Sequence, residues 1–320
     1  MKDTFVRDLV PSQKDILSFF LVHQKDLRFN KSTGEGYLSL VLGDRTGVVD
    51  ARMLDKVEQV PDFSVDDVVW VKATVQIYRN KTQLSIRELR PATDGEVVLA
   101  DYFPRSERDP DEMFRELLAL IGGMPDPNLK ALLQAVLADQ EIAARLKRAP
   151  AAKSMHHAFL GGLLEHVLSL CRLCDLVVQN YPHVRRDLLL AGCVLHDIGK
   201  IYELSYERGV RYTTAGQLLG HTYMSLEVMN AKIRGLPGFP EEWKVLLEHM
   251  IISHHGDYEF GAAKLPMFPE AYMLHLLDNL DAKMESMRAS LASDPAIEGE
   301  WISRCPALER SLLKVDKFLK

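Results

Sequence analysis

Apolar and polar positions alternate with a period of two along residues 1–92, and turn-forming residues interrupt the alternation at regular intervals. This pattern is typical of β-strands with one buried face. It predicts strands at residues 15–24, 36–42, 48–54, 67–78 and 83–89, with hairpin turns at 44–47 and 79–81. Five strands in about 90 residues favour a small closed barrel of the OB-fold type.

The alternation also separates the expected interior of the barrel from its outer surface. The apolar face, which we expect to fill the barrel, consists of Leu38, Leu40, Leu42, Val49, Ala51, Met53, Val69, Val71, Ala73, Val75, Ile77, Leu84 and Ile86. The opposite face places aromatic rings among basic side chains. Such a face suits a single nucleic-acid strand, because bases stack on the rings while phosphates meet the cations.

We therefore take five residues of the outer face as candidates for nucleic-acid binding: Tyr37, Arg52, Lys72, Tyr78 and Arg87. The competing interpretation is an amphipathic outer face without a ligand. For Trp70, on the same face, packing is the favoured role.

From residue 113 onward the apolar positions recur with a period near 3.6, which indicates amphipathic helices. The helices are expected at residues 111–122, 127–147, 157–179, 183–197, 221–234, 241–253, 269–292 and 307–318. The stretch between the two patterns has two prolines and mixed charge, as linkers do. The sequence thus predicts an all-β domain at 1–92, a linker at 93–112 and an all-α bundle at 113–320.

Composition indicates the general class of protein but not its function. A chain of 320 residues with 47% hydrophobic and 26% charged residues resembles ordinary globular protein of two domains. The net charge of −6 argues against a basic coat, so any nucleic acid must bind in a local groove. No window approaches 18 uninterrupted apolar residues, so we expect no membrane association.

Cysteine usage indicates the redox compartment. The four cysteines are Cys171, Cys174, Cys193 and Cys305, and three of them lie in apolar helical stretches. We interpret them as reduced core thiols of a cytoplasmic protein. The CxxC pair at Cys171 and Cys174 is interpreted as packing, because a second pair and a strand-turn-helix context are both missing.

The stretch LAGCVLHDIGKIY, residues 190–202, carries the strongest chemical signal. Neighbouring residues on a helix point about 100° apart, so His196 and Asp197 can share a metal ion only near a helix end. Gly199 would then allow another backbone to approach closely. Lys200 adds a cation one turn beyond Asp197.

Further potential ligands lie on both sides of this stretch. His166, His221 and Asp278 lie on three separate expected helices, and His254 and His255 follow the expected helix at 241–253. A lone histidine on an apolar helix is more often a hydrogen-bonded core residue, but the ordered set favours a metal site. Imidazole and carboxylate together suit Mn, Fe, Zn or Co better than Ca. Seven ligands suffice for two ions bridged by one carboxylate, for which Asp197 is the candidate.

The ordered set resembles that of the HD-domain metal-dependent phosphohydrolases. The run HHAFLGGLLEHV, residues 156–167, together with the OB-like segment, is similar to the YhaM-type 3′–5′ exoribonucleases. The resemblance covers nearly the whole chain. It implies one metal held by His166, His196, Asp197 and Asp278, and a second held by Asp197, His221 and His254, with His255 as an additional candidate.

Two further residues are assigned catalytic roles. Lys200 is expected to offer its charge to the scissile phosphate, and pairing with a carboxylate outside the ligand set is the alternative. His157 is a candidate for substrate contact, with helix capping or solvent exposure as alternatives. His275 and Asp281 flank Asp278 on one helix face and could orient a ligand.

The resemblance implies a 3′–5′ exoribonuclease that degrades single-stranded RNA to nucleoside monophosphates, with single-stranded DNA as an alternative substrate. Two divalent ions are expected, Mn first, with Fe, Co, Mg and Zn as alternatives. A homo-oligomer is consistent with the resemblance. The alternative functions are a nucleotide phosphohydrolase or cyclic-dinucleotide phosphodiesterase on the same scaffold, and a non-catalytic nucleic-acid-binding adaptor.

Overall fold

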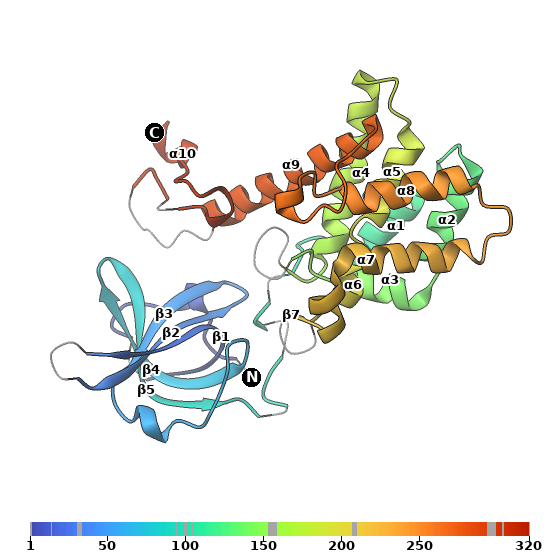
Figure 1. The fold of residues 1–320 in the computed structure, drawn as a ribbon. Coiled ribbons are helices and arrows are strands. Elements are labelled where there is room, and N and C mark those ends of the chain that lie inside the picture. The colour runs from blue at the N-terminus through green and yellow to red at the C-terminus, as the bar shows by residue number, and fades with distance from the viewer. Residues whose placement is uncertain are drawn as a thin grey trace. The chain divides into compact units, whose positions relative to one another are not determined.

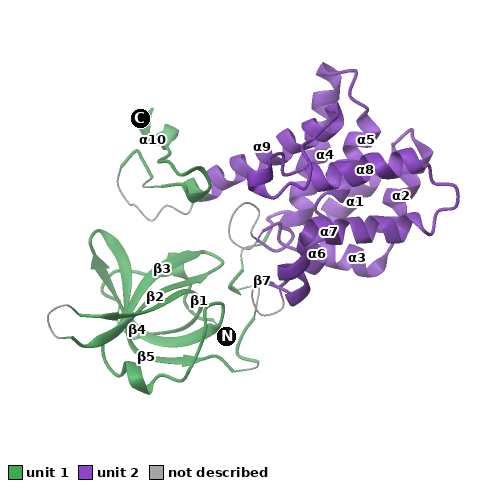
Figure 2. Ribbon diagram, in the orientation of Figure 1, with its two compact units in different colours: residues 1–105, 207–210, 290–320 green, residues 106–206, 211–289 purple. Residues whose placement is uncertain are grey.

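The computed structural model describes residues 2–13, 15–30, 34–93, 95–98, 101–103, 105–152, 159–206, 210–292, 299–302 and 304–319. Two compact units are distinguished by colour in Figure 2. One comprises residues 1–105, 207–210 and 290–320, and the other comprises residues 106–206 and 211–289.

The first unit contains a closed barrel of five strands, seen in blue and cyan in Figure 1. The strands are β1 (Ile16–Phe29), β2 (Gly36–Asp44), β3 (Gly47–Met53), β4 (Val68–Tyr78) and β5 (Lys81–Pro91). Their order around the barrel is β1-β2-β3-β5-β4, and only the short β3–β5 pairing is parallel. The predicted OB-type barrel is confirmed.

The barrel interior matches the expected apolar face at all positions but one. Each predicted interior residue is buried except Ile77, which is 59% exposed. Ile77 and Tyr78 pair with Thr82 and Lys81 at the tip of the β4–β5 hairpin, whereas β3 reaches β5 only at residues 83–85. The tip therefore projects past the end of the barrel, where no interior is left to fill.

The second unit is helical. Its helices are α1 (Pro110–Gly122), α2 (Pro127–Leu137), α3 (Gln140–Leu146), α4 (Gly162–Asn180), α5 (Arg186–Leu195), α6 (Lys200–Glu203), α7 (Thr214–Ile233), α8 (Glu241–Ser253) and α9 (Pro269–Ala292), the last running into the first unit. A small hairpin of β6 (Leu204–Ser205) and β7 (Arg211–Tyr212) lies between α6 and α7. In the part of the chain described, no helix has the length and hydrophobicity needed to cross a bilayer.

Several helix bounds differ from the expected ones for local reasons. The expected helix 127–147 is two helices, because the Asp139 side chain accepts hydrogen bonds from the amides of Glu141 and Ile142 and so starts α3. The expected helix 307–318 is wrong. Glu309 adopts a left-handed backbone, and only a 3-10 turn (Pro306–Leu308) and α10 (Val315–Phe318) form.

Helix α5 forms the centre of the helical unit. Every residue from Leu188 to Leu195 is buried, and the helix packs against α2, α4 and α8. Gly192 permits this packing, because a Cβ atom there would lie 2.2 Å from Met250 Cε. Because α5 has no solvent-facing side from Leu188 onward, the residues that follow it lie in the interior of the bundle.

Candidate metal centre

The residues that follow α5 are His196 and Asp197. His196 forms the C-cap of α5, and the chain then tightens into a turn in which the Ile198 amide donates to the Leu195 carbonyl. The turn brings the two neighbouring side chains together, with His196 Nε2 3.4 Å from Asp197 Oδ2. The predicted placement of this pair at a helix end is confirmed.

Gly199 determines how closely the next helix approaches this turn. A Cβ atom on Gly199 would lie 2.2 Å from the His221 carbonyl oxygen and 2.5 Å from the Ser225 amide nitrogen, both on α7. The Gly199 amide donates to Ser225 Oγ, which in turn donates to the His196 carbonyl. The predicted close backbone approach at Gly199 is confirmed, and it brings His221 to the site.

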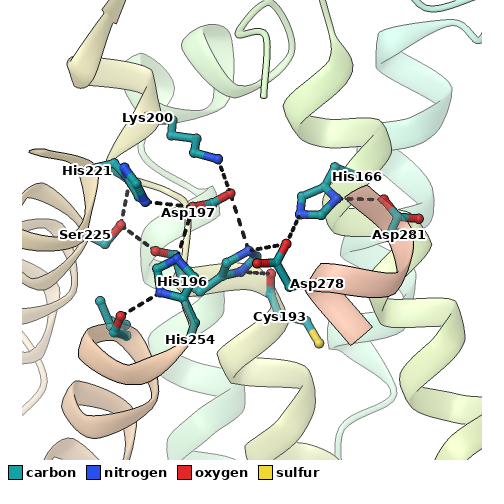
Figure 3. Close-up of polar contacts among 12 residues, drawn as sticks. His166, Cys193, His196, Asp197, Lys200, His221, Ser225, His254, Asp278 and Asp281 are labelled. Carbon is teal, nitrogen blue, oxygen red and sulfur yellow. Dashed lines mark hydrogen bonds and ion pairs between the residues drawn. The ribbon is translucent and has the colours of Figure 1, made fainter. Parts of the chain in front are cut away.

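A first group of potential ligands comes from α4, the end of α5 and α9 (Figure 3). His166 Nε2 lies 3.2 Å from Asp278 Oδ1, and His196 Nε2 lies 3.9 Å from the same oxygen. Ligand atoms of His166, His196 and Asp197 all lie within 4.8 Å of one another. These three residues, with Asp278 beside them, can surround one cation.

A second group comes from α7 and the end of α8. Ligand atoms of His221, His254 and His255 also lie within 4.8 Å of one another. Asp197 Oδ1 is 3.4 Å from His221 Nε2 and 3.7 Å from His254 Nε2. Asp197 therefore directs one carboxylate oxygen toward each group, as a bridging carboxylate would.

The hydrogen bonds of the rings leave their other nitrogens available for a cation. His196 Nδ1 donates to the Cys193 carbonyl, and His254 Nδ1 donates to the Ile251 carbonyl. Among the described residues, His196 Nε2, His221 Nε2 and Asp197 Oδ1 are buried without a hydrogen-bond partner. Buried polar atoms are almost always paired, so this convergence of acceptors fits a bound divalent metal.

Burial and neighbouring charges set the protonation states. Burial lowers the pKa of His254, and the adjacent His196 lowers it further, so that its ring stays neutral. Burial raises the pKa of Asp197, but the charges of Lys200 and His196 outweigh it and hold that pKa well below its usual range. A neutral imidazole and an ionised carboxylate are the forms that bind metal.

His166 is the exception among the histidines. Burial lowers its pKa, but hydrogen bonds to Asp278 and Asp281 outweigh burial and raise the pKa to about 9. In the metal-free protein this ring therefore carries a proton at neutral pH, and a metal ion must displace it.

Lys200 points toward Asp197 in Figure 3, with Nζ 2.6 Å from Asp197 Oδ2. In this arrangement the amino group pairs with a proposed metal ligand, whereas the alternative to phosphate binding was a carboxylate outside the ligand set. Burial lowers the pKa of Lys200, but Asp197 outweighs burial and raises it, so the side chain stays charged. His157, the other catalytic candidate, lies outside the described residues.

The candidate nucleic-acid residues are distributed over several strands of the barrel. Two of the cations are already paired, Lys72 with Glu88 at 3.2 Å and Arg87 with Asp15 at 3.5 Å. Tyr78 is at the projecting hairpin tip, 53% exposed.

Tyr37 and Arg52 lie on the neighbouring strands β2 and β3. Cross-strand pairing places Arg28 opposite Tyr37 and Ser39 opposite Arg52. Arg90 lies opposite Trp70 on the neighbouring strand β5, with its guanidinium 5.4 Å from the centroid of the Trp70 ring.

Several supporting residues carry no recognisable signal in the sequence. Glu203 Oε1 lies 3.1 Å from His221 Nδ1, and Ser225 joins α7 to the turn after α5. Asp281 and His275 were named as potential orienting residues. Asp281 Oδ2 is 2.7 Å from His166 Nδ1, and His275 Nδ1 donates to the His254 carbonyl at 2.9 Å.

Comparisons with known proteins identify the family of this chain. Residues 163–283 match the HD domain family. The 3′–5′ exoribonuclease YhaM of Geobacillus sp. (strain WCH70) is 37% identical over 286 residues, covering 88% of this chain and 87% of the relative. The protein of the same name from Bacillus subtilis (strain 168) is also 37% identical, covering 88% and 90%.

Proposed function

Because this chain belongs to the YhaM family of 3′–5′ exoribonucleases, we propose that it removes nucleoside monophosphates one at a time from the 3′ end of single-stranded RNA. It is a hydrolase of phosphodiester bonds that depends on divalent metal.

One observation carries the proposed site. Donor atoms from α4, α7, α8, α9 and the end of α5 converge on Asp197, and buried acceptors of His196, His221 and Asp197 find no hydrogen-bond partner among the described residues. An adaptor protein would gain nothing from unsatisfied buried acceptors, each of which costs about 1–3 kcal/mol. We propose two ions, one held by His166, His196, Asp197 and Asp278, and the other by Asp197, His221, His254 and His255.

Two divalent ions held by these residues would activate a water molecule at neutral pH and would offset negative charge on the phosphoryl oxygens. The protein's own groups prepare the site for this chemistry. Asp197 keeps its charge, because Lys200 lies 2.6 Å away. Lys200 in turn places an ammonium group beside the ligand groups, where it can meet a non-bridging oxygen of the scissile phosphate.

Manganese is our first choice of metal, and Fe, Co, Mg and Zn are alternatives; a donor set of imidazole nitrogens and carboxylate oxygens argues mainly against calcium, whose sites are built from oxygen. The barrel face around Tyr37 and Arg52 would hold the RNA strand by stacking and charge. Single-stranded DNA is a second substrate of this scheme, since we assign no residue to a 2′-hydroxyl group. We propose a cytoplasmic location, in keeping with four buried free cysteines. We also propose that the chain forms a homo-oligomer.

The test uses the purified full chain and an RNA labelled at its 5′ end. We expect a ladder that shortens by one nucleotide at a time with Mn²⁺ and is absent with EDTA. His196→Ala should abolish the ladder, whereas the control His183→Ala, which alters an exposed histidine, should leave it unchanged.

Intact RNA in the presence of Mn²⁺ would contradict the proposal. In that case cyclic dinucleotides and nucleoside triphosphates become the substrates to try, because a nucleotide phosphohydrolase would use the same ligands.

A further inference from the structure

A break in α7 lies directly before one of the proposed ligands. Gly220 has a non-helical backbone (φ 74°, ψ 159°) that interrupts the helix, and the helix resumes at His221. The first amides of a helical segment have no acceptor within the helix. The His221 amide donates instead to Glu203 Oε1 at 2.9 Å.

The same carboxylate oxygen also contacts the His221 ring. Glu203 Oε1 lies 3.1 Å from Nδ1, so that ring nitrogen carries the proton and donates. The other ring nitrogen, Nε2, is left as an acceptor directed at the metal site, 3.4 Å from Asp197 Oδ1. One carboxylate oxygen therefore fixes the backbone, the ring orientation and the tautomer of His221.

Glu203 is itself held firmly in place. Its side chain is nearly buried, and its carbonyl oxygen accepts from the Thr213 amide at 2.9 Å. The first turn of α7 packs so closely on it that a Cβ atom at Gly216 would lie 2.2 Å from the Glu203 carbonyl oxygen. Burial raises the pKa of this carboxyl group, but the hydrogen bond from His221 outweighs burial and keeps it ionised.

We propose that Glu203 is a positioning residue that makes His221 a metal ligand, so that filling the second metal site depends on Glu203. This inference rests on the proposed two-ion site. Carboxylates that orient a metal-binding histidine typically contribute about 10- to 100-fold to metal affinity.

The first metal site offers a matched control. Asp281 Oδ2 lies 2.7 Å from His166 Nδ1, and Ser169 Oγ donates to the other oxygen of the same carboxylate. Each proposed site thus has one histidine oriented by a carboxylate. Asp281→Asn should weaken the first site, while Glu203→Gln should weaken the second.

The experiment counts metal ions rather than turnover. The full chain is stripped of metal and titrated with Mn²⁺ by equilibrium dialysis, and spin coupling between paired ions is followed by electron paramagnetic resonance. We expect two coupled ions in the wild type. In Glu203→Gln the second ion should bind about 10- to 100-fold more weakly, which would leave an uncoupled Mn²⁺ signal at limiting metal.

The glutamine variant keeps the shape of the side chain and a neutral oxygen that can accept from the His221 amide and ring, so it should fold. It removes the negative charge that makes the His221 ring a stronger ligand. In a double variant with His221→Ala, the Glu203→Gln change should have no further effect on metal affinity, because Glu203 acts only through His221. Two ions bound with unchanged affinity in Glu203→Gln would overturn the inference alone. A wild type that binds one ion would overturn the two-ion site itself, and the inference with it.

Discussion

The barrel and the helical unit each bury an aspartate, and the two carboxylates differ in how many hydrogen-bond donors surround them. Asp44 in the barrel accepts from Lys2 Nζ at 3.0 Å, from the Val6 and Thr46 amides at 2.8 Å, and from Thr46 Oγ1 at 2.5 Å. Asp197 in the helical unit pairs with Lys200 through one oxygen, and its other oxygen has no hydrogen-bond donor among the described residues.

This difference separates a structural charge from a functional one. A buried carboxylate whose acceptor sites are all filled by the protein joins parts of the chain, here the N-terminal segment and the β2–β3 turn. Asp197 has one carboxylate oxygen without a hydrogen-bond donor, and it lies beside imidazole nitrogens of His196 and His221 that also have no hydrogen-bond partner among the described residues. Such a group of buried acceptors can bind a cation. The two residues should therefore respond to substitution in opposite ways.

The largest effect is expected for Asp197→Asn. The change removes charge from both proposed metal sites, so hydrolysis of RNA should fall by at least about a thousandfold. Affinity for RNA should change by less than about threefold, because the barrel face is untouched. Parallel assays of labelled RNA decay and filter binding measure both, and full activity in this variant would contradict a bridging role for Asp197.

Asp44→Ala should act on stability and leave the chemistry intact. It leaves the Lys2 ammonium buried without its counter-ion, which should lower the free energy of unfolding by about 3 kcal/mol. Urea denaturation followed by fluorescence measures the loss, and Mn²⁺ binding by the folded variant should match that of the wild type. If stability were unchanged, Asp44 could not be the structural counterpart of Asp197.

The third prediction concerns pH and His166. Its pKa rises from an ordinary 6.5 to about 9 on folding, so its contribution to metal-free stability is complete below pH 6.5. That contribution, about 3 kcal/mol, should be lost as the pH rises through 9. With Mn²⁺ the direction should reverse, since the ion binds the deprotonated ring.

Thermal unfolding at pH 6, 7.5 and 9, in EDTA and in Mn²⁺, measures this reversal. In EDTA, Asp281→Asn should make the melting temperature depend less on pH, because Asp281 is one of the two carboxylates that stabilise the proton on His166. If the melting temperature depended on pH equally in the wild type and in Asp281→Asn, His166 could not be the source of that dependence.

The smallest effect is expected on the outer face of the barrel. Replacing Tyr37 and Arg52 together by alanine should weaken RNA binding by about tenfold and reduce its salt dependence, because one stacking surface and one cation are lost. Cleavage of a small diester should not change. Tyr181→Ala, an exposed aromatic in the helical unit, serves as the control, and equal losses in both proteins would argue against a specific strand-binding face.

The spacing of apolar residues predicted the barrel and most of the helices, because burial of one face imposes a period of two or 3.6 on the chain. The predictions from periodicity were wrong where another interaction overrides it. Asp139 starts a new helix within 127–147, Ile77 extends past the end of the barrel, and Glu309 adopts a left-handed backbone inside the expected last helix.

The sequence also named the residues of the candidate metal centre, because adjacent histidine and aspartate among ordered outer ligands form a pattern that a core seldom requires. The orientation of these residues depends on tertiary contacts that the pattern does not contain. His166 and Asp281 are 115 positions apart and Glu203 and His221 are 18 apart, so neither pair shares a helical turn. Contacts of this kind depend on how closely helices pack, as Gly199 and Gly216 allow here, and a linear pattern carries no measure of that distance.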